Sequence, residues 1–177
     1  MGSKVRLAAP LQPDSIVDGE GIRTVIWFQG CAHHCEGCHN PESHDFNSGE
    51  EVDISEVEKQ IDALEFQQGV TFSGGDPMYQ PEVAYELAKY CHSKNLNVWV
   101  YTGFLYEKLL EMGEQNPIYL SLLHEIDVLV DGEFELAKKN YSVAFRGSTN
   151  QRIIDVQESL KQNKTVLIEK YEYIEEN

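Results

Sequence analysis

The chain carries the stretch Cys31-Ala32-His33-His34-Cys35-Glu36-Gly37-Cys38, which places three cysteines close together in the spacing C-x3-C-x2-C. An iron–sulfur site with four cysteine ligands closes the coordination of every iron. Three thiolates on a four-iron cubane leave one iron open, and an open position distinguishes a catalytic metal site from a structural one. The stretch therefore predicts a cluster that binds a small molecule and reacts with it.

A zinc site is the alternative interpretation of the same stretch. Structural zinc sites usually pair two ligands with two more at a distance, and a lone triplet with a three-residue first gap fits that pattern poorly. On this interpretation the chain is a non-catalytic zinc or iron–sulfur module that mediates interactions, and the fourth ligand comes from His33, His34, His39 or His44.

The composition limits the class of protein. A length of 177 residues and a hydrophobic fraction of 41% suit one domain over residues 1–177. The net charge of -16 argues against nucleic acid as a partner, and it means that an acidic electron donor needs a local basic patch. No apolar run is long enough to cross a membrane. Clustered thiols without a disulfide framework indicate the cytoplasm.

Hydrophobic patterning predicts strands that alternate with helices. The expected strands are residues 22–28, 70–72, 97–101, 126–130, 151–156 and 165–169. Helices are expected from Ile54, where Asp53 and Glu56 resemble a capping box, and over residues 81–94, 104–112, 118–124 and 158–162. Cys91 lies on the apolar face of the second of these helices, which indicates an inert core position.

Alternating strands and helices predict an α/β fold with a parallel sheet. About six strands are too few for a complete eight-stranded barrel, so we expect an open, partial parallel β/α barrel. The carboxyl ends of parallel strands form one functional face. The cysteine loop, Ser73-Gly74-Gly75-Asp76-Pro77, Tyr101-Thr102-Gly103 and Asp131-Gly132-Glu133-Phe134 each follow a predicted strand, so we expect them to meet there.

These motifs together resemble the radical S-adenosylmethionine enzymes. The flanks Cys38-His39-Asn40-Pro41 and Asn47-Ser48-Gly49 are similar to the cluster loop of glycyl-radical-enzyme activases. Together with SGGDP and Val130-Asp131-Gly132, the segment Arg146-Gly147-Ser148-Thr149-Asn150-Gln151 most resembles the activases of the anaerobic (class III) ribonucleoside-triphosphate reductase.

The resemblance implies one [4Fe-4S] cluster on Cys31, Cys35 and Cys38, with S-adenosylmethionine on the open iron. Glycines at 74 and 75 would let the backbone approach the methionine portion of that ligand. The residues implied around the cluster and S-adenosylmethionine are Gly37, Cys38, His39, Ser73, Gly74, Gly75, Asp76, Thr102, Asp131 and Arg146.

Three of these residues have a second interpretation. Asp76 braces the turn through an Asx-type contact or touches the ligand. Asp131 holds the methionine carboxylate through a monovalent cation, as the resemblance implies, or is a buried strand-end acid bound by backbone amides. Arg146 makes a bidentate contact to carboxylate or phosphate, or is an ordinary loop arginine. Among the histidines, His33 and His34 are expected on a loop surface and His92 and His124 on solvated helix positions.

The implied reaction is reductive cleavage of S-adenosylmethionine at the cluster, with one electron from flavodoxin or ferredoxin. The resulting 5′-deoxyadenosyl radical would take a hydrogen atom from a glycine of the reductase and leave a glycyl radical there. No catalytic acid or base is implied, because the cofactors carry the chemistry. The nearest alternative is an activase of another glycyl radical enzyme, such as pyruvate formate-lyase.

Overall fold

Four parallel strands form the middle of the sheet. They are β3 (Arg23–Phe28), β5 (Gly69–Gly74), β6 (Asn97–Tyr101) and β7 (Val128–Asp131), and each lies within a few residues of its predicted position. The register pairs Ile26 with Phe72 and Phe72 with Val100. The computed structural model describes residues 3–172, and it confirms the α/β class.

Within residues 3–172 the sheet is mixed and has eight strands, so the expected open, partial parallel barrel of about six strands is confirmed only in part: the sheet is open and its central strands are parallel, but its outer strands are not. The additional strands β1 (Lys4–Leu7), β2 (Gln12–Ser15), β4 (Glu50–Asp53) and β8 (Arg152–Asp155) all pair antiparallel with their neighbours. The strand order is β4-β1-β3-β5-β6-β7-β8, with β2 on β3, so β4 and β8 end an open sheet in the described part of the chain.

β8 is antiparallel because no α-helix crosses between it and β7. The connection over residues 132–151 contains only the 3-10 helix η3 (Leu136–Lys138), so β8 starts at the edge of the sheet where β7 ends. The strand expected at 165–169 is wrong. Leu167 makes a single bridge to Ile154, and the 3-10 helix η4 (Glu169–Tyr171) follows.

Five α-helices occupy the positions that the apolar stripes indicated. They are α1 (Ile54–Asp62), α2 (Pro81–Ser93), α3 (Tyr106–Gln115), α4 (Ile118–His124) and α5 (Val156–Gln162). The predicted capping box at α1 does not form: Asp53 makes no side-chain cap, and the Ile54 amide donates to the Ser3 carbonyl at 3.0 Å. Within residues 3–172 no helix has the length and apolar character to cross a membrane.

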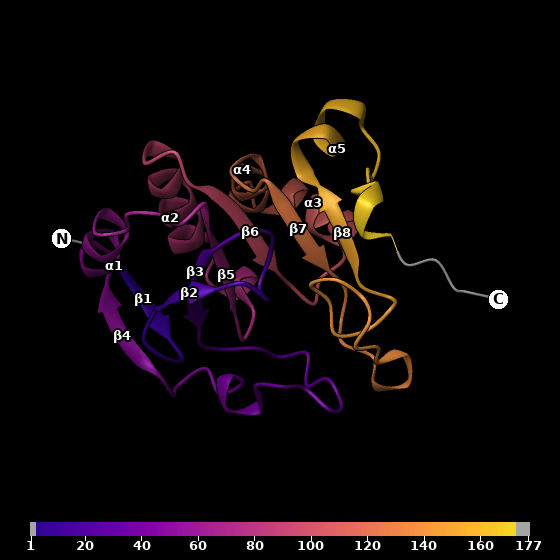
Figure 1. Ribbon diagram of the computed structural model, residues 1–177, viewed down its shortest axis with the longest axis horizontal. Coiled ribbons are helices and arrows are strands. Elements are labelled where there is room, and N and C mark those ends of the chain that lie inside the picture. The colour runs from indigo at the N-terminus through magenta and orange to yellow at the C-terminus, as the bar shows by residue number, and fades with distance from the viewer. Residues whose placement is uncertain (1–2, 173–177) are drawn as a thin grey trace.

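The main core lies between the helices and one face of the sheet. Phe28 and Phe72 are fully buried there, with ring centroids 5.4 Å apart. Cys91 belongs to this core, and burial raises its thiol pKa to about 12, as expected for an inert position. Figure 1 shows the helices along one side of the sheet and the long loops that follow β3 and β7 reaching out at the bottom of the view.

Candidate functional site

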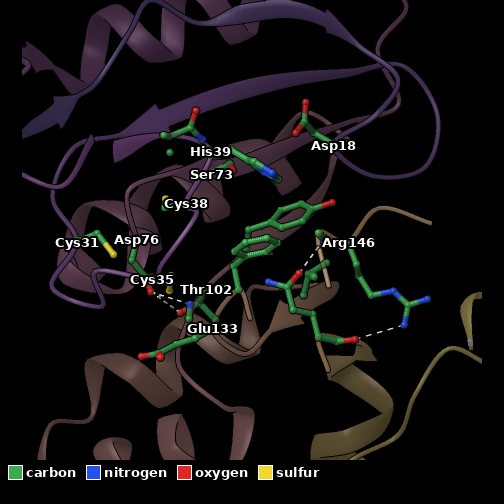
Figure 2. A pocket seen from close by; sticks show the side chains of 18 of the residues that line it. Asp18, Cys31, Cys35, Cys38, His39, Ser73, Asp76, Thr102, Glu133 and Arg146 are labelled. Carbon is green, nitrogen blue, oxygen red and sulfur yellow. Dashed lines mark hydrogen bonds between the residues drawn. The ribbon is translucent and has the colours of Figure 1, made fainter. Parts of the chain in front are cut away.

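A cavity of about 610 Å³ opens where the parallel strands end. All three clustered cysteines line it, together with residues from the ends of β5, β6 and β7. Figure 2 shows Cys31, Cys35 and Asp76 on one side of this cavity and Asp18 and Arg146 on the other. The four strand-end motifs therefore meet at one face, as the parallel arrangement predicted.

Most of the predicted site residues contribute to the cavity wall. Two do not: Gly37 and Asp131 are absent from the lining, although their neighbours Cys38 and Gly132 belong to it. The predicted residues that line the cavity are Cys31, Cys35, Cys38, His39, Ser73, Gly74, Gly75, Asp76, Thr102 and Arg146.

The three cysteines are free thiols. Burial raises the pKa of the Cys31 thiol to about 11 and also raises the pKa of Cys35. Within residues 3–172 no three His, Cys, Asp or Glu side chains are grouped around the position of a single metal ion. A cubane does not require such a point, because each of its thiolates binds a different iron. Three free thiols on one cavity wall fit the donor set of such a cluster.

One backbone hydrogen bond closes the cysteine loop on itself, and another joins the loop to the Gly-Gly turn. The Gly30 amide donates to the Ser43 carbonyl at 2.7 Å, and the Asp76 amide donates to the Gly30 carbonyl at 2.9 Å. A Cβ on Gly75 would lie 2.5 Å from the Gly30 carbonyl oxygen, so it would strike the cysteine loop. Gly74 has a φ of +102°, and Gly75 does not have a positive φ. The turn therefore needs its glycines to pack against the cysteine loop.

The buried Asp76 carboxylate contacts the turn after β5, the loop after β6 and the cysteine loop. Its Oδ1 accepts from the Met78 amide at 2.9 Å, which is the turn brace expected from the sequence. Its Oδ2 accepts from the Thr102 hydroxyl and the Gly103 amide, both at 2.9 Å. Because these donors contact both oxygens, the contacts support the interpretation of Asp76 as a turn brace.

His33 is not on the loop surface, and that expectation is wrong. Its side chain is only 9% exposed and lies between two carboxylates. Nε2 is 2.7 Å from Asp76, Nδ1 is 2.9 Å from Glu133, and the ring packs edge-on against Phe104. The hydrogen bond to Asp76 raises the pKa of His33. His33 thus joins the cysteine loop to the loops that follow β5 and β7.

Asp131 faces away from the cavity. Val130 lines the cavity, and successive side chains of a strand point to opposite faces. The Asp131 carboxylate accepts from Arg152 Nε at 2.9 Å and from the Tyr106 amide at 2.8 Å. These contacts support the interpretation of Asp131 as a buried strand-end acid. The acid of this motif that faces the cavity is Glu133, two residues further on.

Arg146 lines the cavity, but its guanidinium is bound to backbone. Nε donates to Ala144 at 3.2 Å, Nη1 donates to Gln151 at 3.3 Å, and Nη2 donates to the Tyr171 carbonyl. Burial lowers the pKa of this guanidinium. Arg146 therefore connects the segment after β7 to η4 and shapes the wall beside β8.

Several cavity residues were not found from the sequence. Glu133 lies inside a motif that drew attention to Asp131, and the alternation of strand faces could have located it. The His39 ring is 5.2 Å from the Phe134 ring, so the aromatic surface beside the cluster loop includes a residue from the β7 loop. Other cavity residues missed from the sequence include Ile16, Val17, Asp18, Trp27, Tyr141, Val143 and Phe145.

A family model described as a 4Fe-4S single cluster domain matches residues 17–154. The anaerobic ribonucleoside-triphosphate reductase-activating protein of Pasteurella multocida is 38% identical over 152 residues, which cover 80% of this chain and 92% of that relative. The chain belongs to the family of anaerobic ribonucleoside-triphosphate reductase-activating proteins. This confirms the resemblance inferred from the cysteine loop and the strand-end motifs.

Other activating proteins show the same extent of similarity. The relative from Escherichia coli K12 is 33% identical over 150 residues and is covered to 92% of its length. The relative from Enterobacteria phage T4 is 30% identical over 151 residues, which cover 81% of this chain and 90% of the relative. The similarity to these activating proteins thus extends over most of the chain.

Proposed function

We propose that this chain activates an anaerobic ribonucleoside-triphosphate reductase by reductive cleavage of S-adenosylmethionine at a [4Fe-4S] cluster, which generates a glycyl radical on the reductase. The observation that carries the proposal is the arrangement of three free cysteines on the wall of the same cavity as the Gly74–Gly75 turn and Thr102. The name of the relatives supports the choice of partner.

Cys31, Cys35 and Cys38 would hold the cluster. When bound, the cluster supplies the electron that breaks the S–C5′ bond of S-adenosylmethionine and provides an open iron for that ligand. The protein positions the three thiols through the backbone bonds at Gly30 and Asp76. Free thiols of this kind suit a reducing compartment, so we place the protein in the cytoplasm.

S-adenosylmethionine would fill the cavity next to the cysteines. A volume of about 610 Å³ is within the range of small-molecule sites. Ser73 and Thr102 offer polar atoms at the strand ends, and Glu133 offers a carboxylate that is half exposed. The rings of His39 and Phe134, tilted by 47° to each other, offer aromatic faces for adenine. These residues orient the ligand and exclude water, which is the role left to the protein when cofactors carry the chemistry.

The reductase would reach the cavity at its exposed apolar margin. Ile16 and Val17 line the cavity while their side chains are 71% and 69% exposed, which is unusual for aliphatic residues beside a pocket. We propose that a glycine-bearing loop of the reductase enters past this margin.

Cysteine variants test the cluster and the cleavage together. Anaerobically reconstituted protein should contain iron and sulfide and release 5′-deoxyadenosine on reduction, and Cys31→Ala, Cys35→Ala and Cys38→Ala should each lose both properties. Cys91→Ala is the matched control and should keep them. A full cluster in any of the first three variants would contradict the proposal. Zinc in place of iron would favour the non-catalytic module.

A further inference from the structure

The segment after β7 carries an unusual concentration of positive charge for this chain. Residues 136–154 contain no Asp or Glu and four of the chain's 14 Lys and Arg residues, in a protein with a net charge of -16. Arg146 and Arg152 are committed to internal contacts. The charge that remains at the surface belongs to Lys138 and Lys139.

Both lysines stand on a protruding part of the segment. The Lys138 side chain is 52% exposed and makes only an exposed pair with Glu135. Lys139 Nζ lies 4.8 Å from the centroid of the Tyr141 ring, which is 88% exposed. Leu136, at the start of η3, is 46% exposed. We call the surface formed by Leu136, Lys138, Lys139 and Tyr141 the basic knoll.

The basic knoll adjoins the outside of the cysteine loop. A Cβ built on Gly37 would lie 3.0 Å from Leu136 Cδ1, so Leu136 packs against the loop between Cys35 and Cys38. In Figure 1 this segment projects beside the loop that follows β3, at the bottom of the view. A protein bound there would reach the edge of the cluster site, and only Tyr141 of the knoll also lines the cavity.

We propose that the basic knoll is the docking site of an acidic one-electron carrier protein, of the flavodoxin type, that reduces the cluster. This inference rests on the proposed function. The net charge of -16 opposes the approach of an acidic carrier, so a basic and apolar region beside two cluster cysteines favours binding at that place. In the transfer the carrier loses one electron and the cluster gains one, and no proton or group moves.

Charge reversal at the knoll tests the inference. We would measure the binding of oxidised flavodoxin to the reconstituted full chain at low and high salt by isothermal titration calorimetry. Lys138→Glu combined with Lys139→Glu should weaken flavodoxin binding at low salt about tenfold. The affinity of this variant should also change less between low and high salt. The control is Lys161→Glu with Lys164→Glu, which makes the same charge change at two exposed lysines near α5, at the top of the view in Figure 1.

The second measurement is the rate at which the visible cluster absorbance bleaches. With flavodoxin hydroquinone the knoll variant should bleach more slowly than the control variant, whereas dithionite should reduce both variants equally fast. Equal flavodoxin affinity in the two variants would overturn the inference. Unchanged flavodoxin binding with weakened reductase binding would also overturn it and assign the knoll to the reductase. Glycyl radical formation after dithionite reduction tests the proposed function separately, because it bypasses the carrier.

Discussion

Nε2 of His33 lies 2.7 Å from Oδ2 of Asp76, and this contact joins the cysteine loop to the turn after β5. The same Oδ2 accepts from Thr102 and Gly103 of the β6 loop. Three chain segments that are far apart in the sequence thus share one buried oxygen. The relative placement of the cysteines and the Gly-Gly turn depends on it.

Asp76→Asn should loosen this junction. An amide nitrogen at the position of Oδ2 would be a donor facing two other donors, the Thr102 hydroxyl and the Gly103 amide. We therefore expect a loss of about 2 kcal/mol in the free energy of unfolding. Urea unfolding of the protein without its cluster measures the change. Glu86→Gln, at an exposed position on α2, is the control and should change the stability by less than about 0.5 kcal/mol. Equal stability of the two variants would show that the junction is not needed.

Gly75→Ala should damage cluster retention as well as ligand binding. The added Cβ would meet the Gly30 and Ser43 carbonyl oxygens at 2.5 Å and 2.8 Å, so the cysteine loop must move. Iron content after anaerobic reconstitution and gel filtration measures the effect. Gly113→Ala, in α3, adds a Cβ 3.2 Å from the Leu120 side chain and should keep the cluster. If Gly75→Ala kept a full cluster and lost only ligand binding, the turn would contribute to the ligand site and not to the position of the cysteine loop.

Asp131→Asn should destabilise the fold and leave S-adenosylmethionine binding intact. It breaks the ion pair between the buried Asp131 and the partly exposed Arg152, and we expect a cost of about 2 kcal/mol because charged hydrogen bonds are lost. Glu107→Gln removes the exposed partner of the same Arg152, 2.7 Å away, and should cost less than about 1 kcal/mol. Urea unfolding and calorimetric ligand titration separate the two roles. A stable Asp131→Asn protein that no longer binds the ligand would restore the cation-site interpretation.

His92 should make stability depend on pH. It is not a solvated helix position, as the sequence suggested, because its ring bridges Glu125 and Asp127 at 2.8 Å each. Burial opposes the charged ring, but the hydrogen bonds to both carboxylates raise the pKa of His92 above 6.5. A raised pKa in the folded state stabilises the protein below pH 6.5, and this contribution is lost as the pH rises through the folded value.

The loss of stability in His92→Gln should therefore be larger at about pH 6 than at about pH 9. Denaturant unfolding of both proteins at the two pH values measures this difference. His124→Gln, at an exposed position on α4, is the control for the loss of an imidazole side chain. A His92→Gln effect that grows with pH would contradict the assigned direction.

The sequence predicted the four parallel strands because each is a buried run rich in β-branched or aromatic residues, such as Arg23–Phe28. The strand expected at residues 151–156 is confirmed as β8, whereas β1, β2 and β4 gave no such pattern. β4 is Glu-Glu-Val-Asp and pairs with β1 partly through Arg6 and Glu51, while β2 contains Pro13. Short charged or proline-containing edge strands lack alternating hydrophobicity, so only pairing with their neighbours defines them.

The sequence also predicted only part of the candidate site. Residue type and spacing identified the cysteines. The position of each motif directly after a strand predicted that the motifs meet at the edge of the sheet where the parallel strands end. The roles of His33 and Glu133 depend on contacts between separate loops, which spacing along the chain does not contain. The ligand role of Asp131 came from the resemblance, beside its interpretation as a buried strand-end acid, and β7 continues through Asp131, so its side chain points away from the face that carries Val130.

Electron paramagnetic resonance tests the central claim most directly. Reduced, reconstituted protein, S-adenosylmethionine and an anaerobic ribonucleoside-triphosphate reductase are mixed without oxygen, with Cys35→Ala in a matched sample. We predict a glycyl radical doublet and triphosphate reduction with the natural chain and neither with the variant. No doublet from the reductase, with a doublet from pyruvate formate-lyase under matched conditions, would contradict the account and establish the alternative partner.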